Sequence, residues 1–367
     1  MPSGGCLVID TPRNRAAYGQ LVDVIRSGHA LAFAGAGVTR PLGYPNWPEL
    51  IERLALEVRH SRGENIESNG QPITVQQVLR EYKDLPLVQA QVLKENLGEN
   101  YFPLMAELFG FRDGIIASIA DLIALPFKHL LTSNYDTCLE QHHSPSAKPQ
   151  SICLHDAAAP QFITNYADND YTRRVVHVHG RYDGPQQIIL TEDDYGIYVR
   201  SAVFQQFWNT IPVGARLVFF GFSFEDLDLL YGFRHARMAL GGNAQPLEPR
   251  HFGVMALSDP DRETVVTLHL LMRYGIQPVF FLNRTKNFAE YSELLMRLRR
   301  DVSGLALERL ADEPPAAVHE PMLEIVEPEE VAPPPAEATP EALQAGVEHL
   351  TQITRRNIVR RQTGDLE

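Results

Sequence analysis

The chain reads Leu31-Ala32-Phe33-Ala34-Gly35-Ala36-Gly37 near its amino terminus, an apolar run that leads directly into a glycine turn. A short apolar run bounded by turn residues predicts a strand that is buried on both faces, here over 31–34. Two later apolar runs end in a similar way, at Thr132-Ser133-Asn134-Tyr135-Asp136 and at His179-Gly180. Because open parallel sheets bind ligands at the carboxyl ends of their strands, the three phrases predict one shared crevice.

Strand and helix patterns alternate along the rest of the chain, which favours an α/β fold: a Rossmann-like parallel sheet with helices on both faces. Apolar runs predict further strands at 129–132, 175–178, 186–190, 216–220, 251–256 and 278–281. Helical spacing predicts helices at 15–26, 224–240, 260–274 and 287–303. The same spacing dominates from about 47 to 125, where we expect an all-helical insertion after the first strand, with Asn69-Gly70 as a break between helices.

The composition is that of a globular protein, with 44% hydrophobic and 22% charged residues among 367. The three cysteines, Cys6, Cys138 and Cys153, have no CxxC spacing, which argues against a zinc knuckle or a disulfide framework. No apolar run approaches the roughly 20 residues that span a bilayer, and the first residues lack the pattern of a signal peptide. We therefore expect a cytoplasmic protein that does not contact membranes.

The carboxyl-terminal part has a different character from the body, which we expect to be one domain over 1–304. Between 314 and 340 there are eight prolines, and 312–341 holds nine acidic residues with no Lys or Arg. Most of the net charge of −13 comes from this segment, so the charge says little about partners of the body, and direct nucleic-acid binding is not indicated. We predict a disordered linker over 305–338.

A helix is predicted after the linker, over 339–362, because Thr339-Pro340-Glu341 has the residue types of a helix start. Its apolar residues share one stripe: Leu343, Val347, Leu350 and Ile358. Such a helix at the end of an acidic tether is typical of a docking element for a partner, although it could equally pack back on the body.

The glycine turn is typical of phosphate binding, since Gly35 and Gly37 would let backbone N–H groups approach a pyrophosphate. The residues from Val38 to Pro48 include three prolines and a glycine. We expect them to form a loop that folds over a ligand, with Trp47 as a wall, and not a helix that begins at once. The third glycine of the GxGxxG fingerprint is also missing, which excludes an ordinary hydride-transfer site.

Polar residues follow the later strands. Asn134 and Asp136 would face the crevice, although either could simply cap a helix. Strand alternation would place His177 and His179 on the same side, but no accompanying carboxylate or cysteine cluster suggests a metal. A terminal histidine followed by glycine suits a general base better. Gly221-Phe222-Ser223 repeats the order of strand, glycine and polar residue.

These motifs, in this order and spacing, resemble those of the sirtuin-like NAD-binding domain family over roughly residues 15–300: Gly35-Ala36-Gly37-Val38-Thr39, Thr132-Ser133-Asn134-Tyr135-Asp136, His179-Gly180 and Gly221-Phe222-Ser223. Two departures separate the chain from protein deacylases. The zinc module built on paired CxxC motifs is absent, and Pro45-Asn46-Trp47-Pro48 replaces the Pro-Asp-Phe-Arg segment of those enzymes. The chain is therefore more similar to the bacterial branch that hydrolyses NAD in antiphage defence.

The resemblance implies an NAD hydrolase that uses NAD as substrate, without zinc, and yields nicotinamide and ADP-ribose. It implies catalytic roles for Asn134 and His179. The residues that it assigns to NAD binding are Gly35, Ala36, Gly37 and Thr39 for the diphosphate, Gly221 and Ser223 for the adenosine half, and Trp47, Asn134 and Asp136.

Other functions stay open at this point: a subunit that senses NAD or an ADP-ribose nucleotide without turnover, an ADP-ribosyl transferase or zinc-free deacylase, or a scaffold for another enzyme. Because uncontrolled NAD cleavage would kill the host, the resemblance also implies restraint. We expect a homo-oligomer, with a co-encoded partner such as a hexameric ATPase, a nuclease or a short Argonaute, held through the carboxyl-terminal helix.

Overall fold

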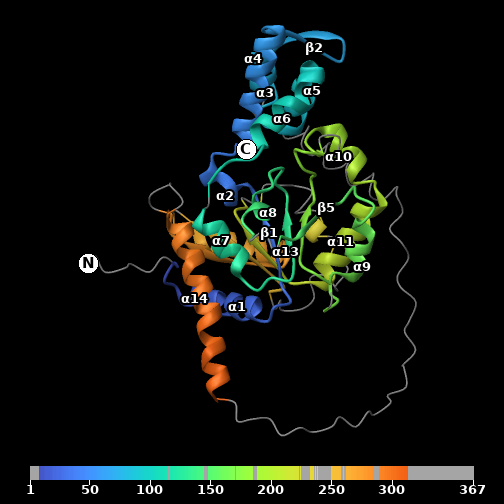
Figure 1. Ribbon diagram of the computed structural model, residues 1–367. Helices are drawn as coiled ribbons and strands as arrows, with labels where there is room; N and C mark the ends of the chain where they lie inside the picture. The colour runs from blue at the N-terminus through green and yellow to red at the C-terminus, as the bar shows by residue number, and fades with distance from the viewer. Residues whose placement is uncertain are drawn as a thin grey trace. The chain divides into compact units, whose positions relative to one another are not determined.

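A parallel sheet with the strand order β5-β6-β4-β1-β7-β8-β9 runs through the part of the chain that the structure describes (Figure 1). The computed structural model describes residues 8–114, 116–143, 148–169, 171–184, 188–222, 224, 232–234, 236, 238, 249–257, 259, 262–283 and 289–312, the last eight without side chains. The strands are β1 (Leu31–Ala34), β4 (Leu130–Thr132), β5 (Gln150–Cys153), β6 (Arg174–His177), β7 (Leu217–Phe220), β8 (His251–Ala256) and β9 (Ile276–Phe281).

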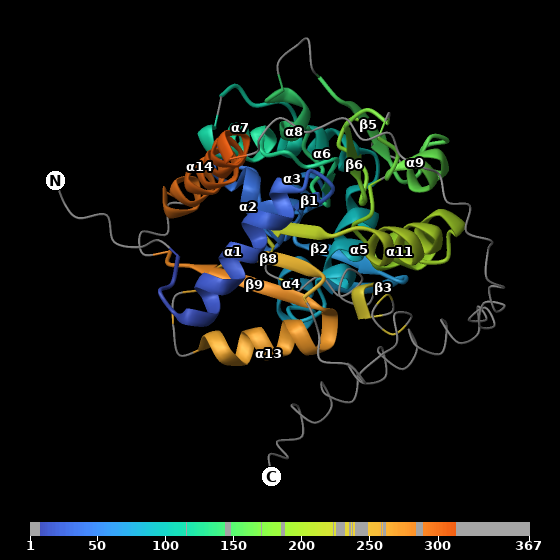
Figure 2. The same cartoon turned by 90° about the horizontal axis from the view of Figure 1, so that it is seen from below.

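Helices cover both faces of this sheet, as predicted, and Figure 2 shows them on either side of it. Alternate residues of β1 enter different cores: Ala32 and Ala34 belong to one, Leu31 and Phe33 to the other. The first core includes α1 (Pro12–Arg26), α7 (Ala117–Ala124) and α14 (Ala289–Asp312). The second includes α9 (Ala159–Asn165), α11 (Ala202–Gly214) and α13 (Glu263–Tyr274). The predicted α/β fold class is therefore confirmed.

The segment between β1 and β4 forms the predicted insertion, but it is not all-helical. It contains α3 (Trp47–Arg62), α4 (Val75–Glu81), α5 (Pro86–Leu97), the 3-10 turn η2 (Gly98–Asn100), α6 (Tyr101–Phe109) and a hairpin of β2 (Asn65–Ser68) and β3 (Gln71–Thr74). Asn69 and Gly70 make the hairpin turn, with φ of 51° and 71°. Left-handed backbone at both positions matches the twist of two antiparallel strands, so this Asn-Gly pair turns a hairpin instead of separating helices.

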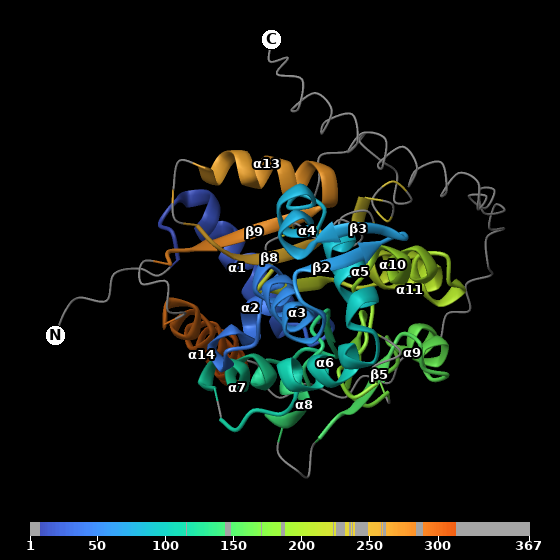
Figure 3. The same ribbon diagram turned by 90° about the horizontal axis from the view of Figure 1, so that it is seen from above.

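The insertion approaches the sheet at the carboxyl end of β4, and in the view from above it lies in front of the strands (Figure 3). Phe109, at the end of α6, packs edge-on against Tyr135, with ring centroids 5.2 Å apart. Tyr44, which precedes α3, also stacks on Phe109, with ring centroids 6.4 Å apart, and donates a hydrogen bond from its hydroxyl to the carbonyl of Gly110. The insertion therefore borders the edge of the sheet where the crevice is predicted.

Several boundaries differ from the predictions. Strand β5 was not predicted, whereas the described residues 188–190 form no strand, and the N–H of Ile189 donates to the carbonyl of His179. Helix α14 continues to Asp312, past the predicted start of the linker at 305. The rest of that linker and the predicted helix over 339–362 lie outside the described residues, as does most of the helix predicted over 224–240. Within the described part of the chain, none of the helices combines the length and apolarity needed to cross a membrane.

Candidate functional site

Four neighbouring strands, β6, β4, β1 and β7, carry the predicted site residues just beyond their carboxyl ends. The chain moves from β1 to β4 in one direction along the sheet and later returns to pair β7 on the other side of β1. The strand order therefore reverses at β1, and such a reversal is where open α/β sheets form ligand crevices. The sequence prediction that these phrases meet at one edge of the sheet is confirmed.

The glycines of the β1 and β7 corners pack directly against one another. The N–H of Gly35 donates to the carbonyl of Phe220 at 2.8 Å, and the N–H of Gly37 donates to the carbonyl of Gly221 at 3.0 Å. A Cβ atom on Gly35 would lie 2.8 Å from the Gly221 oxygen, and one on Gly37 would lie 2.8 Å from the Gly221 Cα. Gly221 itself has φ of 70°. Close approach of two backbones therefore already requires these glycines, before any ligand is considered.

The residues after the glycine turn differ from the predicted loop. A one-turn helix, α2 (Ala36–Thr39), begins at once, and the 3-10 turn η1 (Arg40–Leu42) follows it. Pro41 lies in the first turn of η1, where a proline costs no hydrogen bond because its position has no helical acceptor. The prolines therefore did not exclude short helices, and only residues 43–46 remain an irregular connection to α3.

Asn134 joins the β4 corner to the β1 corner. Its side-chain amide donates to the carbonyl of Gly35 and to the hydroxyl of Thr39, both at 3.2 Å. Its backbone N–H donates to the hydroxyl of Thr132 at 3.0 Å, and that hydroxyl donates to the carbonyl of Ala34 at 2.9 Å. The predicted amide and the predicted glycine turn are thus in direct contact, with Thr39 beside them.

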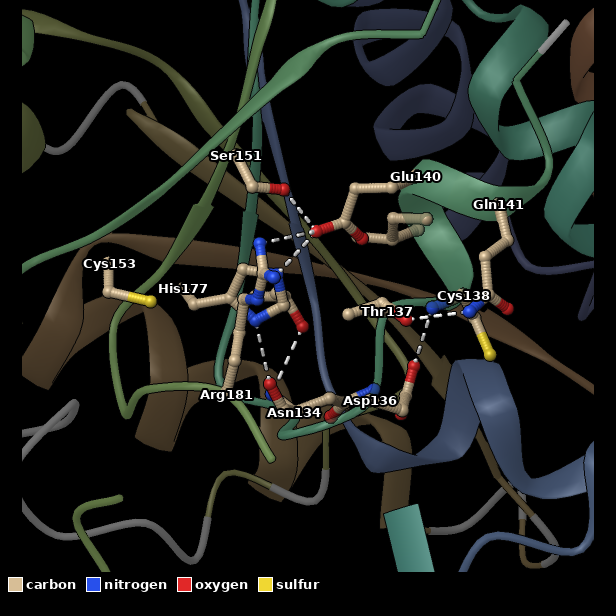
Figure 4. Close-up of polar contacts among 12 residues, drawn as sticks. Asn134, Asp136, Thr137, Cys138, Glu140, Gln141, Ser151, Cys153, His177 and Arg181 are labelled. Atoms are coloured by element: carbon tan, nitrogen blue, oxygen red, sulfur yellow. Dashed lines mark hydrogen bonds and ion pairs between the residues drawn. The ribbon is translucent and has the colours of Figure 1, made fainter. Parts of the chain in front are cut away.

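Asp136 lies just before the short helix α8 (Cys138–Gln141), and its carboxylate accepts the N–H of Cys138 at 3.0 Å (Figure 4). The side chain is buried, and this burial raises its pKa above the ordinary value, although hydrogen bonds from Cys138 and Thr39 act in the opposite direction. The cap residue of α8 is Thr137, without a side-chain cap hydrogen bond, so Asp136 supports the helix start from one residue earlier and is not its cap. A contact with nicotinamide stays a prediction.

His179 lies just beyond β6 and is 4% exposed. Its ring packs edge-on against Tyr195 and Tyr198 of α10 (Glu192–Tyr198), with centroid distances of 5.5 and 6.2 Å. The hydroxyl of Tyr198 also donates to the carbonyl of Val178 at 2.6 Å, which fixes α10 against the end of β6. The sequence prediction missed both tyrosines, because nothing in the spacing of α10 relates them to a histidine on another strand.

The insertion braces α10 from the other side. Lys94 of α5 contacts both carboxylate oxygens of Asp194, at 2.8 and 2.9 Å, and both side chains are partly exposed. Asp194 is also the third residue of the capping box that Thr191 opens at the start of α10. The two tyrosines beside His179 are therefore held by a helix that the insertion contacts through an ion pair.

The structure does not test the predicted roles of two residues, Trp47 and Ser223. Trp47 is the first residue of α3, after a capping box formed by Asn46 and Glu49, and packs against the first core. Its role as a wall of the NAD site stays a prediction. Ser223 lies outside the described residues.

His177 and His179 contact different helices. The ring of His177 lies against Glu140 of α8, and the ring of His179 packs against Tyr195 and Tyr198 of α10. That both lie on the same side of the strand stays a prediction. Over the described ranges, no group of three or more His, Cys, Asp or Glu side chains gathers in a way that could hold a metal ion.

His177 belongs to a buried polar network that the sequence prediction missed (Figure 4). One ring nitrogen lies 2.9 Å from a carboxylate oxygen of Glu140, and the other lies 3.0 Å from the backbone carbonyl of Asn134. The hydroxyl of Ser151 donates to the same Glu140 oxygen, and the guanidinium of Arg181 lies 3.8 Å from it. Burial raises the pKa of Glu140, but the charge of His177 and the hydrogen bonds from His177 and Ser151 outweigh burial and lower it to about 2.

A cavity of about 660 Å³ lies at the opposite edge of the sheet, away from these residues. It is lined by residues that precede the strands, among them Ala30 before β1, Lys128 before β4 and Arg216 before β7. Because the chemical groups of the predicted site follow the strands, this cavity is not the predicted crevice.

The sequence was compared with the models of known protein families. Residues 128–279 match the family model of the SIR2-like domain, a range that includes Asn134, His179 and Gly221. Residues 128–279 are therefore similar to the SIR2-like domain family. The family resemblance drawn from the four motifs is confirmed, and the match also extends over the five strands from β4 to β8 and most of β9.

Two of the similar curated proteins are named NAD(+) hydrolase ThsA, and a third is named a defense-associated sirtuin. The protein ThsA of Enterococcus faecium is 27% identical over 241 residues, which are 64% of this chain and 44% of that protein. ThsA of Bacillus cereus is 23% identical over 302 residues, 76% of this chain and 57% of that protein. Defense-associated sirtuin 2 of Bacillus subtilis is 21% identical over 214 residues, 57% of this chain and 19% of that protein. The chain thus spans between about a fifth and somewhat over half the length of these relatives.

Proposed function

We propose that this protein is an NAD hydrolase, which cleaves the bond between nicotinamide and ribose to give nicotinamide and ADP-ribose and acts in antiphage defence by depleting NAD. The observation that carries the proposal is the direct contact of Asn134 with Gly35 and Thr39 at the edge of the sheet where His179 follows the neighbouring strand, β6. The names of the curated relatives, NAD(+) hydrolase and defence-associated sirtuin, support the same activity and role.

Cleavage of the bond between nicotinamide and ribose requires mainly that the protein position the substrate and the nucleophile. The positive charge of the nicotinamide ring makes it a good leaving group, and the ribose carbon develops oxocarbenium character as the bond breaks. A protein that holds the ribose, excludes bulk water and orients one nucleophile can therefore supply most of the acceleration.

Asn134 is the group that we assign to orienting the attacking water or the ribose hydroxyls. Its backbone is fixed on two sides, through the N–H to Thr132 and through the carbonyl to His177. In the described structure its amide donates to Gly35 and Thr39, so a bound ribose would exchange these hydrogen bonds for its own. A short, anchored side chain of this kind loses little entropy when it binds substrate.

His179 is the group that we assign as general base, on a ribose hydroxyl or on the water. The imidazole is the side chain whose ordinary pKa lies nearest to neutral pH, which suits proton transfer under cellular conditions. The edge-on packing of Tyr195 and Tyr198 restricts the ring, so its orientation is set before substrate arrives.

The glycine corner would hold the diphosphate. Gly35, Gly37 and Val38 already donate their N–H groups to backbone carbonyls. The side chain of Ala36, by contrast, is exposed at the start of α2, and Thr39 presents a hydroxyl beside Asn134. We therefore assign the diphosphate chiefly to Ala36 and Thr39, with Gly221 and Ser223 toward the adenosine half.

The test is release of free nicotinamide from NAD by the purified full chain, with no protein or acyl substrate added. We expect Asn134→Ala and His179→Ala each to lower the rate by at least about 100-fold while the melting temperature stays within about 5 °C of the parent. His60→Ala, which removes an exposed histidine of α3, is the matched control and should retain full activity.

The same assay separates the alternatives. Release of nicotinamide only after a protein or acylated peptide is added would indicate a transferase or deacylase, and NAD binding without release would indicate a sensor. A His179→Ala protein that remains folded and fully active would remove that residue from the mechanism. Homo-oligomerisation, a co-encoded partner and a cytoplasmic location stay predictions.

A further inference from the structure

The proposed mechanism does not use His177, although this histidine is completely buried and is linked by a hydrogen bond to a residue that the mechanism does use. The side chain of His177 is 0% exposed and that of its partner Glu140 is 4% exposed. One ring nitrogen points to the carboxylate of Glu140 on α8, and the other points to the backbone carbonyl of Asn134 (Figure 4). His177 thus joins α8 to the loop that carries Asn134, and the question is what this link does.

Both ring nitrogens of His177 face oxygen atoms. A backbone carbonyl has no proton to donate, so the nitrogen that faces Asn134 is a donor. The other nitrogen faces the Glu140 oxygen that also accepts the hydroxyl of Ser151 and lies 3.8 Å from the guanidinium of Arg181. Burial of the ring between two acceptors, one of them a carboxylate, is the arrangement that suits a donor at each nitrogen.

We propose that His177 is a positioning residue: as an imidazolium kept charged by Glu140, it holds the backbone carbonyl of Asn134 and thereby fixes the amide that acts on NAD. The proposal rests on the proposed function for its kinetic consequence, but not for its geometry. Asn134 then has three anchors: Thr132 on its N–H, His177 on its carbonyl, and Gly35 with Thr39 on its amide.

The proton on the nitrogen that faces Asn134 is what allows His177 to hold the carbonyl of Asn134. If His177 lost the proton on the nitrogen that faces Asn134, a lone pair would oppose the carbonyl oxygen 3.0 Å away. The peptide would turn to escape this repulsion, and the side chain of Asn134 would leave the Gly35 corner with it. Arg181 does not replace the imidazolium, because two of its guanidinium nitrogens, Nε and Nη2, bind the carboxylate of Asp183.

A purely structural role, in which the pair only ties α8 to β6, predicts a different result. Replacing a buried ion pair often changes stability little or even raises it, whereas breaking the pair on one side leaves an uncompensated charge. A tie between two elements would change the melting temperature and leave the turnover of the folded enzyme alone. A clamp on Asn134 would change turnover even in a variant that melts normally.

Glu140→Gln separates these roles. The amide oxygen can occupy the position of the oxygen that accepts from His177 and Ser151, and the NH₂ group can occupy the other position, for which no hydrogen-bond partner is found among the described residues. The shape and both hydrogen bonds are kept, but the negative charge that holds the second proton on His177 is lost. Ser151→Ala is the matched control, because it removes a hydrogen bond to the same oxygen and keeps the charge.

We expect Glu140→Gln to lower kcat for nicotinamide release by about 10- to 100-fold with KM changed by less than about threefold, because the substrate still binds while one reacting group is misplaced. Ser151→Ala should keep kcat within about threefold. In ¹⁵N-histidine NMR spectra of the parent chain at pH 7, His177 should show two protonated ring nitrogens, and in Glu140→Gln only one. The signals are assigned by their loss in His177→Gln.

Two results would overturn the proposal: a parent spectrum with a single proton on His177, or a folded Glu140→Gln protein with parental kcat and no proton on the ring nitrogen that faces Asn134. If Glu140→Gln does not fold, the parent spectrum alone still decides whether the imidazolium exists. If the parent protein releases no nicotinamide, the proposed function fails, whereas the NMR result continues to test the geometry. The two failures are thereby distinguishable.

Discussion

Replacing Gly221 with alanine tests the claim that the β1 and β7 corners support one another. The added Cβ would lie 2.5 Å from the backbone nitrogen of Val38 and 2.9 Å from the carbonyl carbon of Gly37. Both contacts are with backbone atoms, which cannot rotate away as a flexible side chain would. Gly221 also has φ of 70°, a conformation that alanine adopts only with strain.

The expected cost follows from these two terms. Left-handed backbone costs a residue with a Cβ about 1 to 2 kcal/mol, and forcing an extra carbon into a packed site costs about 1 to 3 kcal/mol more. We therefore expect Gly221→Ala to lower the free energy of unfolding by about 2 to 5 kcal/mol, which corresponds to a fall of about 3 to 8 °C in Tm for a domain of this size.

Thermal unfolding followed by circular dichroism measures the change, with Gly19→Ala as the matched control. Gly19 lies in α1, is exposed, and a Cβ there would meet nothing within 4 Å. That substitution should raise the stability by about 0.5 to 1 kcal/mol, because alanine loses less conformational freedom in a helix than glycine does. A Gly221→Ala protein whose Tm equals that of the parent would refute the close packing of the two corners.

Two further predictions concern acid stability and the brace on α10. Burial lowers the pKa of His129 to about 4, and its Nδ1 accepts the N–H of Arg174, so the folded state holds the ring neutral. Between about pH 6.5 and 4 the unfolded chain protonates this histidine and the folded chain does not, so urea titrations should show a loss on the order of 3 kcal/mol, and a smaller loss in His129→Gln. Lys94→Met removes the partner of Asp194, and we expect a loss of about 0.5 to 1 kcal/mol with a fall in nicotinamide release of less than about tenfold. A parental rate together with parental stability would contradict the coupling of the insertion to His179.

The parallel sheet was predictable because its strands are short apolar runs with glycine or polar residues directly after them. The prediction of β1 over 31–34 and of β8 over 251–256 agrees with the structure at both ends. Strand β5 escaped because it lies at the edge of the sheet and begins with Gln150 and Ser151, which are not apolar. The hairpin in the insertion escaped because Asn69-Gly70 was interpreted as a helix break, although this dipeptide equally signals a two-residue strand turn.

The site residues could be predicted only where they directly follow an apolar strand in the sequence. Asn134, His179 and the glycines each follow an apolar run, so their common edge could be inferred from topology alone. Glu140 gives no such signal, because it becomes important only when α8, β5 and β6 bring Ser151 and His177 to it. The glycine turn also had two explanations that the sequence cannot separate, access for a phosphate and close packing against Gly221.

The position of β1 between β4 and β7 has a consequence for synthesis. Leu31–Ala34 leaves the ribosome early, and the whole insertion must follow before the first strand that pairs with it. The second neighbour, β7, and the Gly221 that supports Gly35 and Gly37 appear only after more than half of the chain has been translated. Such long-range pairing folds slowly, since loops must close before contacts form. A growing polypeptide therefore cannot assemble this edge of the sheet until Gly221 has been made.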